Sequence, residues 1–279
     1  MFIKCWGSRG SIPVSGKDYL KYGGNTTCIE IRAKSDDIII IDAGTGIREL
    51  GNKLTKERIS TYNIIFTHAH WDHIMGFPFF KPLYSKKTSL RMYQCPFHSK
   101  FVETILPKIL SPPNFPIKYS DLKAKIFYEE VNQTKWQIGS ISVTPISLSH
   151  PNGGSGYKFV EDNKSFVFLT DNELGFVHPN GLTYKDYLKF SAGADLLIHD
   201  AEYTPEEYVR HIGWGHSVYT EVLDLAFESG VKKLGLFHLN PGRTDKKMDQ
   251  IVKTCRTIIS ENNHNLKCFA VGSNATFEL

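Results

Sequence analysis

Short apolar runs alternate with polar or glycine-rich turns along most of the chain, a pattern typical of β-strands separated by loops and helices. The strands expected from it span residues 2–5, 26–32, 36–42, 62–66, 90–95, 156–160, 165–170, 195–198, 234–237, 269–271 and 276–279, with a further strand pair in 137–149. Expected helices span 47–54, 100–106 or slightly beyond, a segment from Ser217 or Thr220 to Gly230 with a Ser or Thr cap, and 246–261. Segments 269–271 and 276–279 are expected to close the second of two sheets.

Composition places the chain among ordinary globular proteins. It has 279 residues, of which 41% are hydrophobic and 22% charged, so we expect one domain over residues 1–279. The longest apolar runs, such as 38–41, are far shorter than the roughly 20 residues that cross a bilayer, and the N-terminus lacks a signal-peptide layout. We therefore expect no membrane span and a cytoplasmic protein.

The cysteines and the charge argue against a disulfide framework, a zinc knuckle and a nucleic-acid-binding protein. Five cysteines are scattered without a Cys-x-x-Cys pair, which argues against a disulfide framework or a zinc knuckle and favours buried free thiols. The net charge of +4 permits an anionic substrate. Because Lys and Arg are dispersed in short doublets such as Lys86-Lys87, the sequence predicts no stable nucleic-acid complex.

The candidate chemistry is concentrated where the apolar run 62–66 ends. His68, His70, Asp72 and His73 follow within six positions. The two-residue period of a strand would direct His68 and His70 to one side, and the following turn would redirect the other two. Imidazole and carboxylate ligands suit zinc or another first-row divalent ion. The alternative, a polar helix N-terminus at the surface, does not account for three histidines beside an aspartate.

The pattern His-x-His-x-Asp-His resembles the signature of the metallo-β-lactamase superfamily. The resemblance implies an αββα sandwich of two mixed sheets with outer helices, and two zinc ions, or manganese in their place. It implies three more ligands, which His150, Asp171 and His238 supply at strand ends in the required order. Asp42 would support the metal loop without being a ligand. By this resemblance one metal is held by His68, His70 and His150, the other by Asp72, His73 and His238, and Asp171 bridges them.

Two further segments resemble the phosphodiesterase branch of the superfamily, which contains the tRNA 3′-processing endonucleases and small cyclic-phosphate hydrolases. They are residues 199–203, His-Asp-Ala-Glu-Tyr, and 213–217, Gly-Trp-Gly-His-Ser. The resemblance implies that His216 contacts the phosphate or donates a proton to the leaving oxygen, with Asp200 orienting it; Asp72 completes the catalytic set. Glu202 stands where the branch has Thr, so either acid could pair with His216. A His-Ser cap at a helix start is the structural alternative.

The substrate is inferred from what the chain lacks and from a closer resemblance. Only twenty residues separate His150 from Asp171, which leaves no room for the arm of the tRNA-processing enzymes. Through residues 22–26, 42–46 and 213–217 the chain is similar to bacterial and phage cyclic-nucleotide phosphodiesterases, including the anti-Pycsar group. This resemblance implies hydrolysis of 3′,5′-cyclic mononucleotides by a homodimer. The alternatives are an RNase Z-like or other single-strand nuclease and a nucleotide-binding protein without turnover.

Two loops each allow two interpretations from the sequence. Residues 111–117 are rich in proline and form either a lid, acting on this site or on a partner's, or a packed connection; Phe115 or Tyr119 is the candidate for stacking on a base. The glycine-rich segment 7–11 is either a tight turn, which we favour, or a phosphate cradle, although it lacks the lysine of a P-loop.

Overall fold

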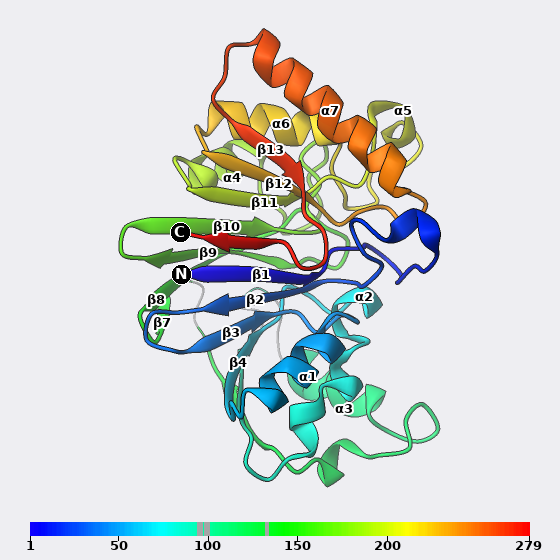
Figure 1. Cartoon of the computed structure of the whole chain (residues 1–279), viewed down its shortest axis with the longest axis vertical. Coiled ribbons are helices and arrows are strands. Elements are labelled where there is room, and N and C mark those ends of the chain that lie inside the picture. The colour runs from blue at the N-terminus through cyan, green and yellow to red at the C-terminus, as the bar shows by residue number, and fades with distance from the viewer. Residues whose placement is uncertain (94–96, 98–100, 132–133) are drawn as a thin grey trace.

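The computed structural model describes residues 1–93, 97, 101–131 and 134–279. Within them, two seven-stranded sheets pack face to face (Figure 1). In spatial order the first sheet consists of β14 (Thr276–Glu278), β1 (Phe2–Gly7), β2 (Cys28–Arg32), β3 (Ile38–Ile41), β4 (Thr61–Ile65), β5 (Ser89–Tyr93) and β6 (Lys125–Glu129). The second consists of β13 (Lys267–Ala270), β12 (Lys233–Phe237), β11 (Leu196–Asp200), β10 (Lys164–Leu169), β9 (Ser155–Glu161), β8 (Ile141–Ser147) and β7 (Trp136–Ile138).

Both sheets are mixed, and helices cover their outer faces (Figure 1). Strands β3 to β6 run parallel, as do β10 to β13, while the remaining pairs are antiparallel. Beside the first sheet lie α1 (Ile47–Lys56), α2 (Trp71–Ile74) and α3 (Phe101–Ile109); beside the second lie α4 (Tyr184–Ser191), α5 (Pro205–Tyr208), α6 (Tyr219–Glu228) and α7 (Asp245–Glu261). This four-layer arrangement confirms the αββα sandwich expected from the sequence.

Strand β3 shows why the layers stack in this way. Its four isoleucines are all buried, and the two-residue period of a strand sends them to opposite faces. Ile38 and Ile40 pack into the core beneath α1, whereas Ile39 and Ile41 pack into the core between the two sheets. A strand that is apolar on both faces can only lie inside a layered fold, because either face would otherwise meet water.

The C-terminal strand β14 lies in the first sheet, whereas from the sequence we expect it in the second; that expectation is wrong. Segment 269–271 closes the second sheet as expected, within β13, but β14 pairs antiparallel with β1 at the edge of the first sheet. Between them the chain crosses from one sheet to the other, and Phe277 then packs its ring 5.2 Å from that of Phe269. Pairing with a strand at the opposite end of the chain leaves no local pattern, so the sequence could not indicate it.

Other elements agree with the expectations or add to them. Strand β6 and helix α4 were not expected. The helix expected from Ser217 or Thr220 begins at Tyr219, and Val218 occupies its cap position without a side-chain cap, so the Ser or Thr cap is wrong; Gly230 follows its end in the left-handed conformation, as expected. The last residues of segment 90–95 and the first residue of segment 100–106 lie outside the described residues.

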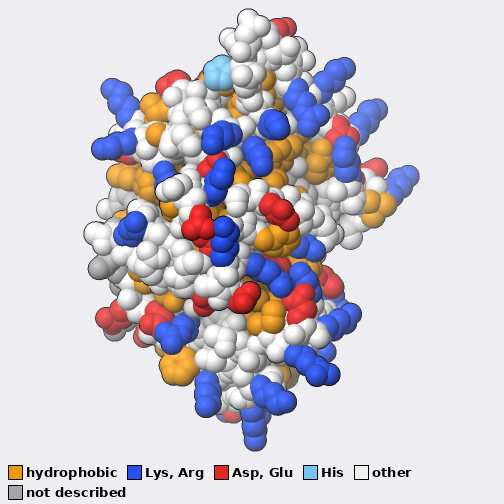
Figure 2. Space-filling model, turned by 60° about the vertical axis from the view of Figure 1, so that its left-hand side comes forward, with side chains coloured by type: hydrophobic (Ala, Val, Ile, Leu, Met, Phe, Trp, Pro, Cys, Tyr) orange, Lys and Arg blue, Asp and Glu red, His pale blue; other side chains and the backbone are white. Residues whose placement is uncertain are grey.

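Four cysteines are buried and free, which confirms the expectation for Cys5, Cys28, Cys255 and Cys268; Cys95 lies outside the described residues. In the described part of the chain no helix is both long and apolar enough to cross a membrane. Figure 2 shows that basic side chains are spread over the height of one face with acidic ones among them, in agreement with the dispersed charge of the sequence.

Candidate metal centre

All seven predicted metal ligands lie at the same end of the two sheets, where strands give way to loops. His68 and His70 follow β4, and α2 carries Asp72 and His73. From the second sheet, His150 follows β8, Asp171 follows β10, and His238 follows β12. Each half of the sandwich thus supplies candidate ligands to the seam between the two sheets.

Two of these strand ends have unusual backbone. Asp171 has φ of 54° and His238 also has φ of 54°, in the left-handed region that non-glycine residues rarely adopt. Such a conformation costs about 1–3 kcal/mol and persists only where the surroundings hold it. At both positions it bends the chain at once after a buried strand, in the residue whose side chain enters the site.

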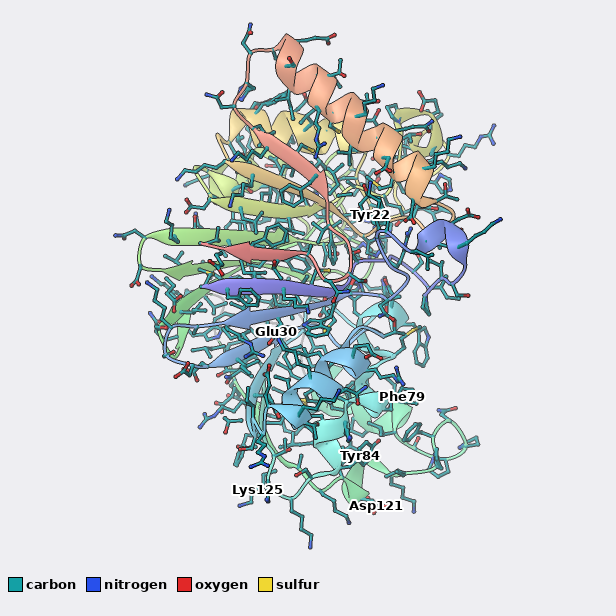
Figure 3. All side chains as sticks on the ribbon, viewed as in Figure 1. Tyr22, Glu30, Phe79, Tyr84, Asp121 and Lys125 are labelled. Carbon is teal, nitrogen blue, oxygen red and sulfur yellow. The ribbon has the colours of Figure 1, made fainter. Side chains whose placement is uncertain are left out.

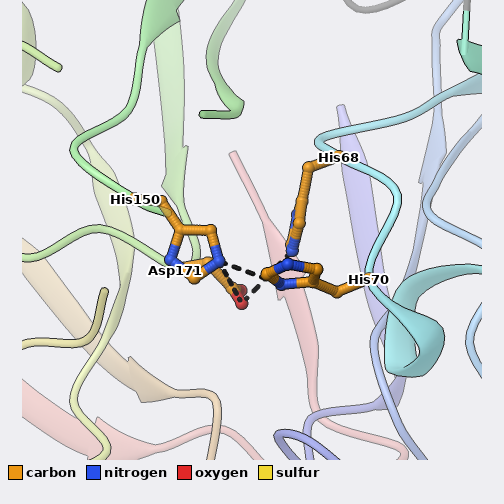
Figure 4. A group of neighbouring side chains, drawn as sticks. All are labelled: His68, His70, His150 and Asp171. Atoms are coloured by element: carbon orange, nitrogen blue, oxygen red, sulfur yellow. Dashed lines mark hydrogen bonds and ion pairs between the residues drawn. The ribbon is translucent and has the colours of Figure 1, made fainter. Parts of the chain in front are cut away.

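The side chains form two clusters that share Asp171. In the first, His150 Nε2 lies 3.0 Å from His70 Nδ1, and His68 Nε2 lies 3.5 Å from Asp171 Oδ2 (Figure 4). Each cluster offers one ligand atom per residue, all within 4.8 Å of one another.

The second cluster joins α2 to the second sheet. His238 Nε2 lies 3.1 Å from Asp72 Oδ2 and 3.3 Å from Asp171 Oδ2. His73 Nε2 lies 3.2 Å from Asp72 Oδ2 and 3.2 Å from Asp171 Oδ1. Asp171 Oδ1 thus faces His73, while Oδ2 faces both His68 of the first cluster and His238 of the second, so the carboxylate lies between the two clusters, where the resemblance implies a bridging ligand.

A second set of residues holds the outer nitrogens of the histidines. His73 Nδ1 lies 2.8 Å from Asp42 Oδ2, and His238 Nδ1 lies 2.9 Å from Glu202 Oε2. His150 Nδ1 donates to the carbonyl of Gly215 at 2.9 Å. Partners of this kind fix the tautomer and the ring orientation of metal-binding histidines. Asp42 also accepts from Thr67, and it therefore supports the metal loop in the way expected for a residue that is not a ligand.

The donor set fits divalent metal ions. His68 Nε2 and His73 Nε2 are buried and have no hydrogen-bond partner among the described residues. Burial lowers the pKa of His150 to about 3, so its imidazole is neutral, and because Nδ1 donates to Gly215, the lone pair lies on Nε2, which faces the cluster. The Nε2 atoms of His68 and His73 face the carboxylates of Asp72 and Asp171 at 3.2–3.5 Å without forming a hydrogen bond, and a metal ion bound among them would satisfy both kinds of ligand.

The structure settles which acid pairs with His216. Its Nδ1 lies 2.6 Å from Asp200 Oδ2, whereas Glu202 serves His238 and lies 3.7 Å from His216 Nε2. Burial would lower the pKa of His216, but Asp200 and Glu202 together raise it to about 9. Ser217 is no helix cap: its hydroxyl donates to the carbonyl of Asn172 at 2.5 Å. The structural alternative for the His-Ser pair is therefore wrong.

The glycine-rich segment 7–11 is neither the tight turn favoured from the sequence nor a phosphate cradle, because it continues beyond β1 and Arg9 forms isolated parallel bridges with Thr26 and Leu239. The amides of Ser8 and Arg9 donate to the carbonyl of Asn25, and that of Ser11 donates to Asp72 Oδ2 at 2.9 Å. The backbone donors that would bind a phosphate are thus already used. Gly10 is required here, because a Cβ on it would lie 2.2 Å from the ring of His238.

A pocket of about 400 Å³ opens onto the clusters. It is lined by Ser11, Ala69, His70, Trp71, Asp72, Asp171, His216 and His238. None of these described residues is Lys or Arg. A larger hollow of about 730 Å³ lies between α7 and β13 and contains none of the candidate residues.

Phe115 and Tyr119 do not line this pocket. Phe115 packs edge to face on Phe79, with ring centroids 5.8 Å apart; Figure 3 shows Phe79 beside the helices of the first sheet. The hydroxyl of Tyr119 lies 2.6 Å from that of Tyr128. These contacts favour a packed connection within the chain, and a role at the site of a partner stays a prediction.

Sequence reasoning missed two residues of the site. Trp71 lies inside the metal-binding motif and lines the pocket, yet an x position of a motif carries no signal of its own. Glu173 is buried just after Asp171 and accepts hydrogen bonds from the loop that carries His216. Its only signal was an acidic residue close to a ligand in the chain.

A four-layer αββα sandwich with paired His/Asp clusters at its strand ends defines a metal-dependent hydrolase. A family model described as "Beta-lactamase superfamily domain" matches residues 38–239, and the chain belongs to this superfamily, whose fold is that of the metallo-β-lactamases and binds two metal ions.

The relatives and the similar structures agree with this family. The chain is 25% identical over 254 residues to a ribonuclease Z of Sulfurisphaera tokodaii, covering 76% of this chain and 80% of that protein. The metallo-β-lactamase fold protein YhfI of Bacillus subtilis superposes with a TM-score of 0.74 at 17% identity, covering 100% of this chain and 98% of that one. A diphosphatase of the PhnP family gives a TM-score of 0.69 at 16% identity, covering 100% and 97%.

Proposed function

We propose that this protein is a phosphodiesterase that hydrolyses small cyclic phosphodiesters, above all 3′,5′-cyclic mononucleotides, and that zinc, or manganese in its place, occupies the two clusters. The observation that carries the proposal is the position of His216. It lines the same pocket as ligands of both clusters and is held at Nδ1 by a buried acid.

The size and lining of the pocket support a small substrate. A volume of about 400 Å³ is near the lower end of the range for small-molecule sites. Proteins that bind single-stranded nucleic acid use a positively charged groove along the backbone. The described residues that line this pocket include no basic side chain.

The residues divide the reaction between them. His68, His70 and His150 would hold one ion, Asp72, His73 and His238 the other, with Asp171 shared. Such ions lower the pKa of a water molecule and polarise phosphoryl oxygens. Asp200 fixes His216 through Nδ1, which leaves its Nε2 proton for the leaving sugar oxygen. Water adds across the ester: its oxygen joins phosphorus, the P–O3′ bond breaks, and the proton that the water loses replaces the one given by His216.

A second candidate is an endoribonuclease, and the ribonuclease Z relatives favour it. Against it stand the short connection between His150 and Asp171 and the absence of basic residues in the described pocket lining. A cytoplasmic homodimer is part of the proposal, as is a role in counteracting cyclic-nucleotide signals against phage.

The test is hydrolysis of 3′,5′-cyclic AMP, GMP, CMP and UMP with added zinc or manganese, beside single-stranded RNA and a precursor tRNA. Metal-dependent cleavage of cyclic nucleotides, lost in Asp72→Ala and in His216→Ala, is expected. His264→Ala, which changes a histidine packed on Phe227 away from the pocket, is the matched control and should retain activity. If either RNA is cut and the cyclic nucleotides are not, the endoribonuclease is the correct function.

A further inference from the structure

Trp71 is an exposed aromatic residue at the edge of the candidate site. It lines the pocket and stands between the ligands His70 and Asp72 in the chain. Its side chain is 61% exposed, and its ring contacts no other aromatic ring of the described residues. A large apolar surface therefore faces the solvent directly beside the atoms that would bind a phosphate.

The backbone beneath this ring is fixed. Trp71 is the first residue of α2, and its carbonyl accepts from the amide of Met75 at 2.8 Å. The same helix is bound to the first sheet, because the amide of Ala43 donates to the carbonyl of His73 at 2.7 Å. A tryptophan on a rigid segment has only two side-chain torsions to order, so it offers a large contact area at low entropic cost.

We propose that the indole of Trp71 is a stacking platform for the base of the substrate. The substrate class is then a phosphodiester that carries a nucleobase close to its phosphate. This inference rests on the proposed function. Stacking on an aromatic side chain tolerates every base, since each base has a π-face, and it is stronger for purines, which have the larger ring.

The test compares cyclic AMP with ribose 3,5-cyclic phosphate, which has the same phosphate ring and no base. Trp71→Ala should raise KM for cyclic AMP by about 5- to 150-fold, the equivalent of one lost stacking contact, and Trp71→Phe should restore part of the affinity. KM for the base-free compound should be unchanged. Phe127→Ala, which removes an exposed aromatic ring on β6, should alter neither.

Four results would overturn the inference, and they are distinguishable. An equal effect of Trp71→Ala on both compounds would mean that the residue supports the metal loop. A change of molar mass in solution would mean that it belongs to a subunit interface. If the wild-type protein cleaves the base-free compound and cyclic AMP with the same KM, only the platform fails. If it cleaves neither, the proposed function fails as well.

A different observation carries a second inference. The Glu173 carboxylate is 1% exposed and accepts four hydrogen bonds. Oε1 accepts from the Tyr208 hydroxyl at 2.6 Å and from the amide of Gly213 at 2.7 Å. Oε2 accepts from the amide of Gly215 at 2.7 Å and from His178 Nε2 at 2.8 Å. A carboxylate can accept from all four donors because both of its oxygens are acceptors, whereas an amide side chain has only one acceptor oxygen.

The backbone that Glu173 holds leads directly to the catalytic histidine. Gly215 precedes His216, and its carbonyl accepts from His150 Nδ1 at 2.9 Å. The loop has no regular secondary structure between α5 and α6, so these bonds replace a helix or strand as its support. The geometry assigns Glu173 as a positioning residue for His216 in the proposed reaction.

Two substrates whose leaving groups differ in their need for a proton can distinguish a positioning role of Glu173 from a role in folding. Glu173→Gln replaces one oxygen by an NH₂ group that faces donors, so the loop should shift. Turnover of cyclic AMP, whose sugar alkoxide needs a proton, should fall about 10²-fold. Turnover of bis(p-nitrophenyl) phosphate should change little, because nitrophenolate leaves without one. His216→Ala should likewise lower the turnover of cyclic AMP and change that of bis(p-nitrophenyl) phosphate little.

The control is Glu161→Gln, a buried carboxylate that binds the amide of Lys34 and the amino terminus. It should lower the melting temperature without changing the ratio of the two activities. Equal loss on both substrates in Glu173→Gln, with loss of bound metal, would show that Glu173 acts through His150 and overturn the assignment. Unchanged turnover of both would also overturn it. If the wild-type protein cleaves the nitrophenyl ester and not cyclic AMP, the proposed substrate is wrong and this assignment falls with it.

Discussion

The two halves of the sandwich supply the candidate metal ligands in different ways. In the first half, His68, His70, Asp72 and His73 are neighbours in the chain, delivered by one strand end and one short helix. In the second half each ligand comes from a separate strand, and Asp171 and His238 have left-handed backbone. The first set depends on local sequence, whereas the second depends on tertiary structure that holds strained residues in place. The halves should therefore respond differently to mutation.

The largest effect is expected at Asp171, because its carboxylate belongs to both clusters. Asp171→Asn should bind neither ion firmly and should lose activity by several orders of magnitude, since groups that act as a unit fail together. His68→Ala removes a ligand of one cluster only. It should retain the ion held by Asp72, His73 and His238. Metal per chain, measured by mass spectrometry after dialysis, checks both expectations.

Retention of both ions in Asp171→Asn, with activity lost, would mean that Asp171 acts on substrate and bridges nothing. The amide has nearly the same shape as the acid and leaves the left-handed backbone in place, so a fold change should not obscure the result. Circular dichroism of both variants provides that control.

The next largest effect is expected at two glycines that lie against candidate ligands. Comparing them separates backbone strain from steric crowding by an added Cβ. A Cβ at Gly215 would lie 2.1 Å from His150 Nδ1, and φ there is 94°. A Cβ at Gly10 would lie 2.2 Å from the ring of His238, with no unusual φ. Gly215→Ala should therefore destabilise the fold and weaken metal binding, each more than Gly10→Ala, which overpacks the site at a cost of about 1–3 kcal/mol. Thermal unfolding and metal titration of each variant measure the difference; an equal loss in both would leave crowding as the only cause.

The outer partners of the histidines give a smaller effect. Asp42→Asn and Glu202→Gln each leave a ligand Nδ1 without its carboxylate, and metal affinity should fall about 10- to 100-fold in either case. Asp42 also accepts two hydrogen bonds from the amide and the hydroxyl of Thr67, whereas Glu202 accepts one more, from Asn240 Nδ2 at 2.9 Å. The Asp42 variant should therefore lose more stability than that of Glu202. Competition with a chromogenic chelator and urea unfolding measure the two quantities, and the opposite order of stability would contradict the asymmetry.

The same contrast explains what the sequence could predict. The layered fold could be predicted from strand periodicity and from apolar runs such as β3, because an apolar residue in a strand indicates directly that its face of the sheet is buried. Four of the seven candidate ligands stand inside one motif, whereas His150, Asp171 and His238 each follow a strand and also needed the order that the family resemblance implied. The edge position of β14 was wrong because it depends on a partner at the other end of the chain.

Pairings between distant side chains were equally beyond reach. The choice between Asp200 and Glu202 for His216 depends on how β11 and the following turn direct two acids that are two residues apart. Trp71 and Glu173 stood in the sequence without a pattern that distinguished them. The backbone conformation of Asp171 leaves no mark on residue choice either, because a ligand position cannot be given to glycine.

The smallest effect lies at the far end of the second sheet, where no functional strain is expected. Asp195 accepts from the amide of Ser165 at 2.9 Å and from Lys232 Nζ at 2.8 Å. Burial would raise its pKa, but these hydrogen bonds outweigh burial and hold the pKa below its usual value. The resulting stability is present above the unfolded pKa of about 3.9 and is lost as pH falls through the lower folded value. Asp195→Asn should therefore be less stable than the wild type at pH 7, by under about 1 kcal/mol because Lys232 is exposed to solvent, and the two should converge towards pH 3. Urea unfolding across this range measures the gap. A constant gap would mean that the charge of Asp195 contributes nothing and that its hydrogen bonds alone account for the difference.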